Sequence, residues 1–244
     1  EKKRQISIMN NFREIFRKLD IGFSPDKEDK LVGYMEEILE LNQHINLTAI
    51  TDRDEFTKKH YIDSLLCVGY DEFKNAKTII DVGTGGGFPG VPLAIAFPEK
   101  KFILIDSLNK RIKIINDLCA KLGIKNVEAV HGRAEELARK KDMRECFDLC
   151  VSRAVANMST LAEYCLPFVR KGGAFIAYKG PDCGEELNAA AKAIKVLGGK
   201  MIKEESPQFE GLPFDHKLIF IKKENNTGSK YPRKAGTPSK EPIS

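Results

Sequence analysis

The chain has 244 residues, of which 42% are hydrophobic and 31% charged. This length suits one α/β domain with appendages or two small domains, and the hydrophobic core it allows needs no disulfide or metal ion. No run approaches the roughly 18 apolar residues of a membrane span, and no signal-peptide pattern is present, so we expect a cytoplasmic protein that is neither secreted nor membrane-inserted.

The charge is concentrated at the two ends of the sequence. The net charge is +5, residues 1–18 and 222–244 each carry +4, and the residues between them sum to −3. Basic ends of this kind can attract a polyanion, although they also serve as mere solubilising ends. The final stretch, 224–244, is rich in Pro and Gly and has few large apolar residues, which predicts a flexible basic tail.

Six cysteines are scattered through the apparent helices and strands, and none forms a CxxC pair. Cys150 lies in an apolar run, where a small buried hydrophobic residue is the simpler interpretation than a metal ligand. We therefore expect reduced cysteines and no metal site.

The first part of the chain is predicted to be helical. Apolar residues recur at helical spacing over 10–19, and Ser24 followed by Pro25 is typical of a helix start, with the helical pattern continuing to about His44. Asp52 and Glu55 resemble a capping box that opens another helix. Residues 1–75 are thus predicted to form an N-terminal helical cap.

The rest of the chain alternates strands with helices. Short apolar, β-branched runs at 77–83, 101–106, 126–130, 147–152, 173–179 and 216–223 are separated mostly by helical segments such as 108–122 and 182–197. This alternation predicts an α/β fold with a doubly wound parallel sheet over residues 76–223. The strand-like stretch 199–205 and the last strand permit an antiparallel edge pair. No coiled-coil pattern is present, so we expect a monomer.

A glycine-rich turn follows the first strand. Asp81, Gly83, Gly85 and Gly87 fit the pattern acidic-x-Gly-x-Gly-x-Gly completely, whereas the dinucleotide pattern G-x-G-x-x-G fits only in part. The complete pattern resembles the class I S-adenosylmethionine-dependent methyltransferases. Asp81 can help to bind the ammonium of that cofactor while the loop amides meet its carboxylate. The alternative is a turn in which the glycines only satisfy backbone geometry.

Three further positions follow later strands. Asp106 ends the second strand and can accept the hydroxyls of a ribose, unless it only caps the next helix. Ala134 and Glu135 follow the third strand, where they could contact adenine, although acidic residues are common in a first helical turn. Arg153 ends the fourth strand and is either an anion clamp or a surface charge.

Several segments together resemble one family. NLTAITDRDEFTKKHYIDSL, DVGTGGGFPGVPLAI, DSLNKR, GRAEE, VSRAVA and YPRKAGTPSKEPI are similar to the bacterial ribosomal RNA small subunit methyltransferase G family, also called glucose-inhibited division protein B. The resemblance runs from about residue 30 to the end. It implies a class I methyltransferase (Rossmann-like) fold with an N-terminal helical extension. It also implies methylation of N7 of guanine 527 in the 16S rRNA of the small ribosomal subunit.

The resemblance adds residues to the expected S-adenosylmethionine site. The family's cofactor contacts, carried over onto matching positions, fall on Gly83, Phe88, Asp106, Ser107, Leu108, Ala134, Glu135 and Arg153. Asp81 and Gly85 join them from the glycine pattern.

The chemistry of the expected acceptor atom decides which catalytic groups we expect. Guanine N7 has a lone pair and no proton, so no general base is needed and catalysis is mostly alignment. His44, His60, His131 and His216 have no clear acidic partner in the sequence and are interpreted as structural. Arg133, Arg153 and Lys179 are predicted to position the substrate by holding phosphates or guanine O6.

The tail supplies the expected RNA contacts, Lys230, Tyr231, Arg233 and Lys234. Truncation after Lys223 is predicted to weaken RNA binding and to spare cofactor binding. Three rival functions remain: a methyltransferase acting on a protein or small molecule, an RNA-binding assembly factor, and an NAD-dependent dehydrogenase. The acidic residue before Gly83 disfavours the dehydrogenase, and the basic ends disfavour a small-molecule acceptor.

Overall fold

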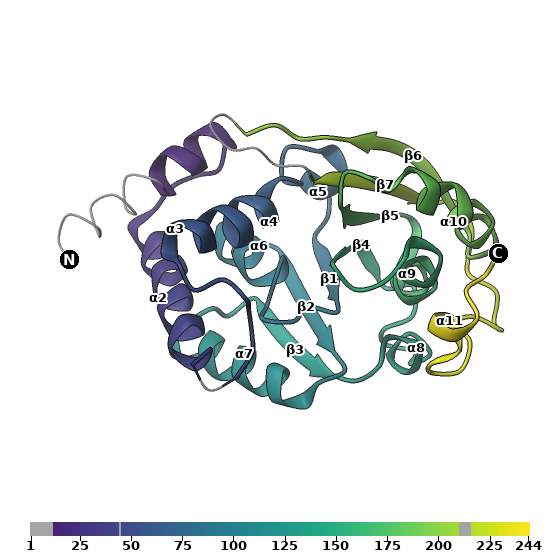
Figure 1. The fold of residues 1–244 in the computed structure, drawn as a ribbon, viewed down its shortest axis with the longest axis horizontal. Coiled ribbons are helices and arrows are strands. Elements are labelled where there is room, and N and C mark those ends of the chain that lie inside the picture. Colours follow the sequence, from purple (N-terminus) through teal and green to yellow (C-terminus); the bar gives the residue numbers. More distant parts are fainter. Residues whose placement is uncertain (1–11, 44, 210–215) are drawn as a thin grey trace.

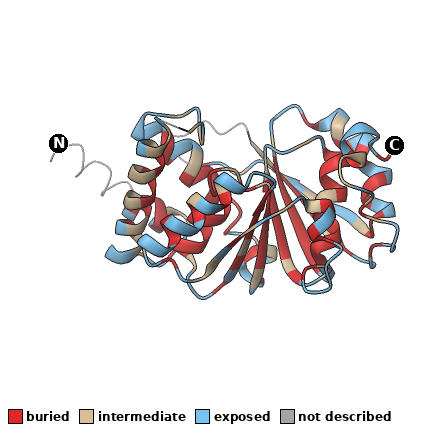
Figure 2. Ribbon diagram, turned by 90° about the horizontal axis from the view of Figure 1, so that it is seen from below, coloured by how far each residue is buried: buried red, intermediate tan, exposed pale blue. Residues whose placement is uncertain are grey.

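A seven-stranded sheet lies at the centre of the molecule, between two layers of helices (Figures 1 and 2). The computed structural model describes residues 12–43, 45–209 and 216–244. The strand order is β3-β2-β1-β4-β5-β7-β6. The strands are β1 (Thr78–Val82), β2 (Lys101–Asp106), β3 (Val127–His131), β4 (Phe147–Arg153), β5 (Val169–Lys179), β6 (Gly199–Glu205) and β7 (Lys217–Lys223).

The central strand β1 is parallel to both of its neighbours and is buried. β1 pairs in parallel with β2 and β4, and its residues 79–82 are buried, as expected for a strand covered on both faces. Only β7 runs against its neighbours, pairing antiparallel with β5 and with the edge strand β6. The predicted doubly wound α/β fold and its antiparallel edge pair are therefore confirmed.

One face of the sheet is covered by the N-terminal helices together with α6 and α7. Residues 12–18 are helical, and Ser24 caps α2 by accepting the Lys27 N–H at 3.3 Å. The apolar side chains of these helices join those of the sheet in one core, which continues across residue 75. The helices on this side are α2 (Pro25–Leu41), α3 (Arg53–Phe56), the π-helix η1 (Thr57–Ile62), α4 (Asp63–Leu65), α5 (Asp71–Lys74), α6 (Gly90–Ala96) and α7 (Asn109–Lys121).

The other face of the sheet carries a second core beneath a second layer of helices. The most extensive helix–helix packing there joins α10 to α9, and the C-terminal helix α11 lies beside α9 (Figure 1). These elements are α8 (Ala134–Leu137), α9 (Met158–Cys165), the 3₁₀-helix η2 (Leu166–Phe168), α10 (Gly184–Val196) and α11 (Thr237–Lys240).

The segment 224–244, which the sequence predicts to be a flexible basic tail, makes contacts with the body of the molecule. This segment packs along α8 and α9, and it is held by polar groups from distant parts of the chain. The guanidinium of Arg144 donates to the carbonyl oxygens of Thr227 and Tyr231 at 2.7 and 2.9 Å, and Arg139 donates to that of Pro232 at 2.6 Å. The composition of the tail does not reveal these partners, because they lie 83 to 93 positions earlier.

The cysteines form no disulfides. Five of the six thiols are buried, and only Cys146 is exposed. Cys146 directly follows Arg144 and Glu145, and the carboxylate of Glu145 accepts the Thr227 N–H of the tail at 2.7 Å. Across the described ranges, no helix combines the length and the apolar character needed to cross a membrane.

Some predictions fall on residues outside the described ranges. These are the basic residues of 1–11, His44, and most of the loop before β7, 210–215.

Candidate active site

The glycine-rich turn forms at the carboxyl end of β1. Gly85 and Gly87 have positive φ values of 59° and 92°, which most L-residues avoid. A side chain at Gly87 would overlap the hydroxyl of Tyr34, which donates to the carbonyl of Gly86 at 2.9 Å. Beside Gly85 nothing lies within 4 Å of a Cβ position, so a ligand can approach its backbone.

Asp81 is fully buried and shapes this turn. Its Oδ2 accepts the Thr84 hydroxyl at 2.6 Å and the Gly90 N–H at 2.9 Å, whereas its Oδ1 has no hydrogen-bond partner. Burial raises the pKa of Asp81 to about 6, against hydrogen bonds that lower it. One carboxylate oxygen is therefore structural, and the other is an unused acceptor.

Asp106 closes β2 and touches the same turn. Its Oδ2 accepts the Gly85 N–H at 3.0 Å, and its Oδ1 accepts the Leu108 N–H at 2.9 Å. Arg111 lies 3.6 Å from Oδ2. Asp106 thus holds the backbone of Leu108, the residue before α7, but no side chain caps that helix, so the helix-cap alternative for Asp106 is not supported.

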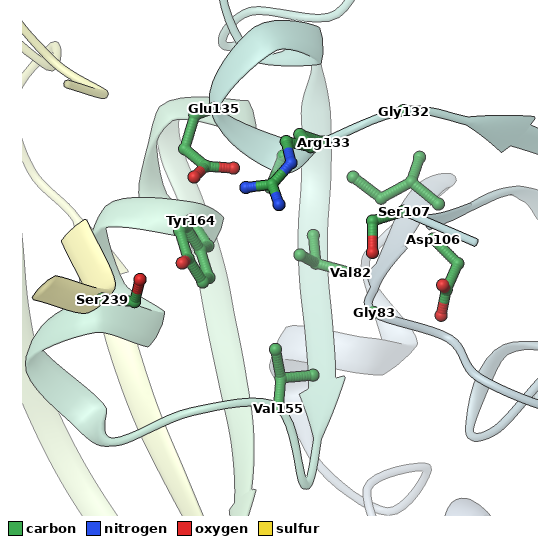
Figure 3. A pocket seen from close by; sticks show the side chains of 12 residues that line it. Val82, Gly83, Asp106, Ser107, Gly132, Arg133, Glu135, Val155, Tyr164 and Ser239 are labelled. Atoms are coloured by element: carbon green, nitrogen blue, oxygen red, sulfur yellow. The ribbon is translucent and has the colours of Figure 1, made fainter. Parts of the chain in front are cut away.

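A cavity of about 260 Å³ opens beside these groups (Figure 3). Of the predicted cofactor residues it brings together Gly83, Asp106, Ser107, Ala134 and Glu135, and the predicted positioning residue Arg133 joins them. Asp81, Gly85, Phe88, Leu108 and Arg153 do not line it. The remaining lining residues are Val82, Ile105, Gly132, Val155, Tyr164 and Ser239.

None of these six remaining residues was predicted from the sequence, and three of them come from the far walls of the cavity. The side chain of Val155 lies over Gly83. A Cβ atom added at Gly83 would lie only 2.4 Å from the Cγ2 atom of Val155. Tyr164 comes from α9 and Ser239 from α11, and both lie on the side of the cavity away from Asp106 (Figure 3). Neither has a local motif, and only the packing of α11 on α9 brings Ser239 to the cavity.

Glu135 faces the tail. Its side chain is almost fully buried, and its Oε1 accepts the Gly236 N–H at 2.8 Å. The carboxylate that was predicted to contact adenine therefore also fixes residue 236 of the tail.

Arg153 lies in a separate ionic cluster at the same edge of the sheet. Its guanidinium donates to Asp63 Oδ2 at 2.5 Å and to the Lys59 carbonyl at 3.1 Å. The other oxygen of Asp63 lies 2.6 Å from His216 Nδ1. Burial raises the pKa of Asp63, but the hydrogen bond with His216 and the charge of Arg153 outweigh it and lower that pKa.

An aromatic stack adjoins this cluster. The rings of His60 and Phe88 are 4.3 Å apart and nearly parallel, and the Arg153 guanidinium lies 5.6 Å from the Phe88 ring. Burial, and then the charge of Arg153, lower the pKa of His60 to about 3, so its imidazole is neutral. His60 Nε2 contacts the Thr48 hydroxyl at 2.7 Å.

Sequence reasoning missed this arrangement because its members are far apart. His216 has an acidic partner after all, Asp63, which lies 153 positions earlier. The exposed His131 ring contacts the Ser107 carbonyl oxygen at 3.2 Å.

The predicted substrate-positioning cations differ in availability. Arg133 is exposed at the cavity, whereas Lys179 pairs with Glu186 at 2.5 Å and donates to the Ala156 carbonyl at 3.0 Å. Among the residues that the structure describes, no cluster of His, Cys, Asp or Glu side chains is arranged to hold a metal ion.

The predicted RNA-binding residues of the tail also differ. Lys230 and Lys234 are exposed, and Tyr231 is half-buried with the Lys230 ammonium 5.1 Å from its ring. Arg233 forms a two-pronged ion pair with the fully buried Glu163, with Nη2 to Oε2 at 2.7 Å and Nε to Oε1 at 3.0 Å. This ion pair occupies the Arg233 guanidinium, which would have to leave Glu163 before it could bind RNA.

Comparison with known proteins agrees with this geometry. A model of the family "rRNA small subunit methyltransferase G" matches residues 27–209. The ribosomal RNA small subunit methyltransferase G of Clostridium perfringens is 49% identical over 221 residues, which cover 91% of this chain and 92% of that protein. The namesake from Alkaliphilus oremlandii is also 49% identical, over 225 residues that cover 92% of this chain and 94% of that protein.

Two solved structures share the fold, at identities too low to carry more than that. An O-methyltransferase from Bacillus cereus in complex with SAH has a TM-score of 0.54 and 17% identity, and covers 78% of this chain and 90% of that one. A putative O-methyltransferase from Klebsiella pneumoniae has a TM-score of 0.55 and 16% identity, and covers 92% of this chain and 100% of that one. The resemblance inferred from the sequence motifs is confirmed, and the chain belongs to the rRNA small subunit methyltransferase G family.

Proposed function

We propose that this chain transfers a methyl group from S-adenosylmethionine to N7 of guanine 527 in the 16S rRNA of the small ribosomal subunit. The observation that carries the proposal is the cavity at the carboxyl ends of β1, β2 and β3, where open α/β sheets bind ligands, in a chain of this family. We place the reaction in the cytoplasm and assign it to a monomer.

The residues present fit the proposed cofactor. The unpartnered Oδ1 of Asp81 is a suitable acceptor for an ammonium group, and the open space beside Gly85 admits a ligand to the loop amides. The Asp106 carboxylate accepts two backbone N–H groups and keeps lone pairs for ribose hydroxyls. When bound, S-adenosylmethionine supplies an electrophilic methyl group on a sulfonium.

In this proposal the protein aligns the reactants and supplies no general base. Guanine N7 attacks with its own lone pair, so no proton has to be removed first. Arg153 acts as a positioning residue: its bond to Asp63 fixes α4 against the end of β4.

The surface cations complete the proposed substrate side. Arg133 is exposed at the cavity and can hold a phosphate, and Lys230 and Lys234 are exposed on the tail. Lys179 would have to leave Glu186 before it could bind the RNA. The half-buried ring of Tyr231 can stack on a base only by its exposed part.

The direct test is methyl transfer from labelled S-adenosylmethionine to small ribosomal subunits that lack the modification, followed by nucleoside analysis. We expect label in 7-methylguanosine of 16S rRNA, and loss of the label when guanine 527 is replaced. Label in protein or in another nucleoside would overturn the proposed acceptor. Cofactor binding without transfer to subunits or to naked 16S rRNA would favour an assembly factor, and NAD binding would favour a dehydrogenase.

A further inference from the structure

The last part of the tail is seated on α8 and α9 by three contacts. Arg233 pairs with the fully buried Glu163, and its backbone N–H also donates to that carboxylate at 2.6 Å. The Gly236 N–H donates to Glu135 at 2.8 Å, and the buried Thr160 hydroxyl donates to the Pro238 carbonyl at 2.9 Å. Each contact joins the tail to a residue 70 or more positions earlier.

The seated segment reaches the cavity described above. Ser239 of α11 lines the cavity together with Tyr164 of α9, opposite Asp106 and Ser107 (Figure 3). α11 contacts α9 directly, and α9 also contacts α8, the helix that carries Glu135. Ser239, at the end of the seated segment 233–239, therefore forms part of the cavity wall, and undocking of the segment would open that side of the cavity.

One carboxylate links the tail to the interior of the cavity. Glu135 lines the cavity and at the same time holds the Gly236 N–H. A ligand that orders the Glu135 side chain must therefore also order the tail, and a displaced tail leaves a buried carboxylate without its donor. Such coupling is reciprocal, because the free energy that the tail adds to ligand binding equals the free energy that the ligand adds to tail docking.

We propose that residues 233–239 close the adenosine end of the cofactor pocket, so that tail docking and cofactor binding stabilise each other. This inference rests on the proposed function. Ser239 and the ring of Tyr164 contact the cofactor, whereas Arg233, Glu163 and Glu135 are positioning residues. The adenosine end is assigned because Asp106 and Ala134, at the ends of β2 and β3, line the same cavity. The prediction that loss of the tail spares cofactor binding is thereby reversed.

The test measures S-adenosylhomocysteine binding to the full chain by calorimetry, with Arg233→Ala as the principal variant. We expect its affinity to fall at least tenfold, and Arg233→Lys to recover part of the loss. The matched control is Arg170→Ala, which removes an arginine–carboxylate pair with Asp148 at the amino ends of β4 and β5, far from the cavity. We expect the control to bind within twofold of the unaltered chain.

Hydrogen exchange of the unaltered chain provides a second readout that does not depend on the variant folding. S-adenosylhomocysteine should slow exchange at least tenfold at the Gly236 amide, and it should leave the Thr78 amide, which donates to Asp148, unchanged. Equal affinity in a folded Arg233→Ala chain, or unchanged exchange at Gly236 on saturation, overturns the inference while the proposed cofactor stands. Failure of the unaltered chain to bind S-adenosylhomocysteine overturns both.

Discussion

Two neighbouring sites at the carboxyl edge of the parallel strands, the cavity and the ionic cluster around Asp63, are built in different ways. On the cavity side, Asp106 accepts N–H groups from Gly85 and Leu108, 21 and 2 positions away, and the strand–helix–strand unit of β1, α6 and β2 brings these groups together. On the other side, Asp63 meets Arg153 and His216, which lie 90 and 153 positions further along the chain. The glycine-turn wall of the cavity is therefore mostly backbone geometry set by local sequence, whereas the ionic cluster exists only in the complete fold.

The largest expected effect comes from the ionic cluster. Arg153→Ala leaves the fully buried Asp63 carboxylate with His216 alone, so we expect the free energy of unfolding to fall by about 3 kcal/mol or more. We also expect methyl transfer to fall severely, because the contact between α4 and β4 loosens. Urea unfolding and the transfer assay measure the two effects.

Arg170→Ala calibrates that prediction. Its ion pair with Asp148 has a half-exposed arginine, and exposed pairs contribute about 0–1 kcal/mol. A loss of stability in Arg153→Ala no greater than in Arg170→Ala would mean that the cluster is not held by the buried pair.

The glycine turn provides the next test. Two substitutions there share the cost of a positive φ but differ in the free space around the added methyl group. Gly87→Ala adds a methyl group against the Tyr34 hydroxyl as well as the cost of a positive φ, so we expect about 3 kcal/mol of destabilisation. Gly85→Ala meets open space, so we expect about 1 kcal/mol. Equal losses, measured by urea unfolding, would show that packing under the turn is unimportant.

The pH dependence of cofactor binding tests the unused oxygen of Asp81. The pKa of Asp81 is raised to about 6, and a bound ammonium favours the ionised carboxylate, so binding must displace a proton below pH 6. The affinity for S-adenosylhomocysteine should therefore be nearly full at pH 7.5 and about tenfold weaker at pH 5. In Asp81→Asn we expect weaker binding without this pH dependence, and a pH slope that survives the substitution would assign the proton to another group.

The smallest expected effect is on RNA binding, and it comes from the exposed lysines of the tail, which lie outside both the cavity and the ionic cluster. Replacing Lys230 and Lys234 by Ala should reduce the salt dependence of RNA binding by roughly 0.7 in log–log slope for each lost phosphate contact. The affinity for S-adenosylhomocysteine should not change. An unchanged slope on small ribosomal subunits would exclude these lysines from the RNA interface.

The sequence predicts those parts of the fold and of the site that depend on residues close in sequence, and not those that depend on distant contacts. Alternating apolar runs and helices predict the sheet, and the acidic-glycine pattern predicts the turn, because both depend on residues close in sequence. Asp106 is found for the same reason. Tyr164 and Ser239 are not found, since nothing near them in the sequence marks a site.

The tail shows what its composition cannot predict, namely its contacts with distant residues. Its few apolar residues suggest a segment that cannot fold by itself, and that argument considers only the tail's own side chains. Its stability comes from partners elsewhere, including Glu163 and Arg144, and from Lys223. The Lys223 ammonium is fully buried between the Leu166 carbonyl and the Thr227 hydroxyl, a position that no pattern of charge in the sequence predicts.

The distribution of the thiols has a practical consequence for watching the tail move. Five of the six cysteines are buried, so a maleimide dye added to the native protein should react at Cys146 and nowhere else at a comparable rate. That position adjoins Arg144 and Glu145, both of which hold the tail near Thr227. A single fluorophore on the unaltered sequence would therefore report undocking of the tail as a change in emission.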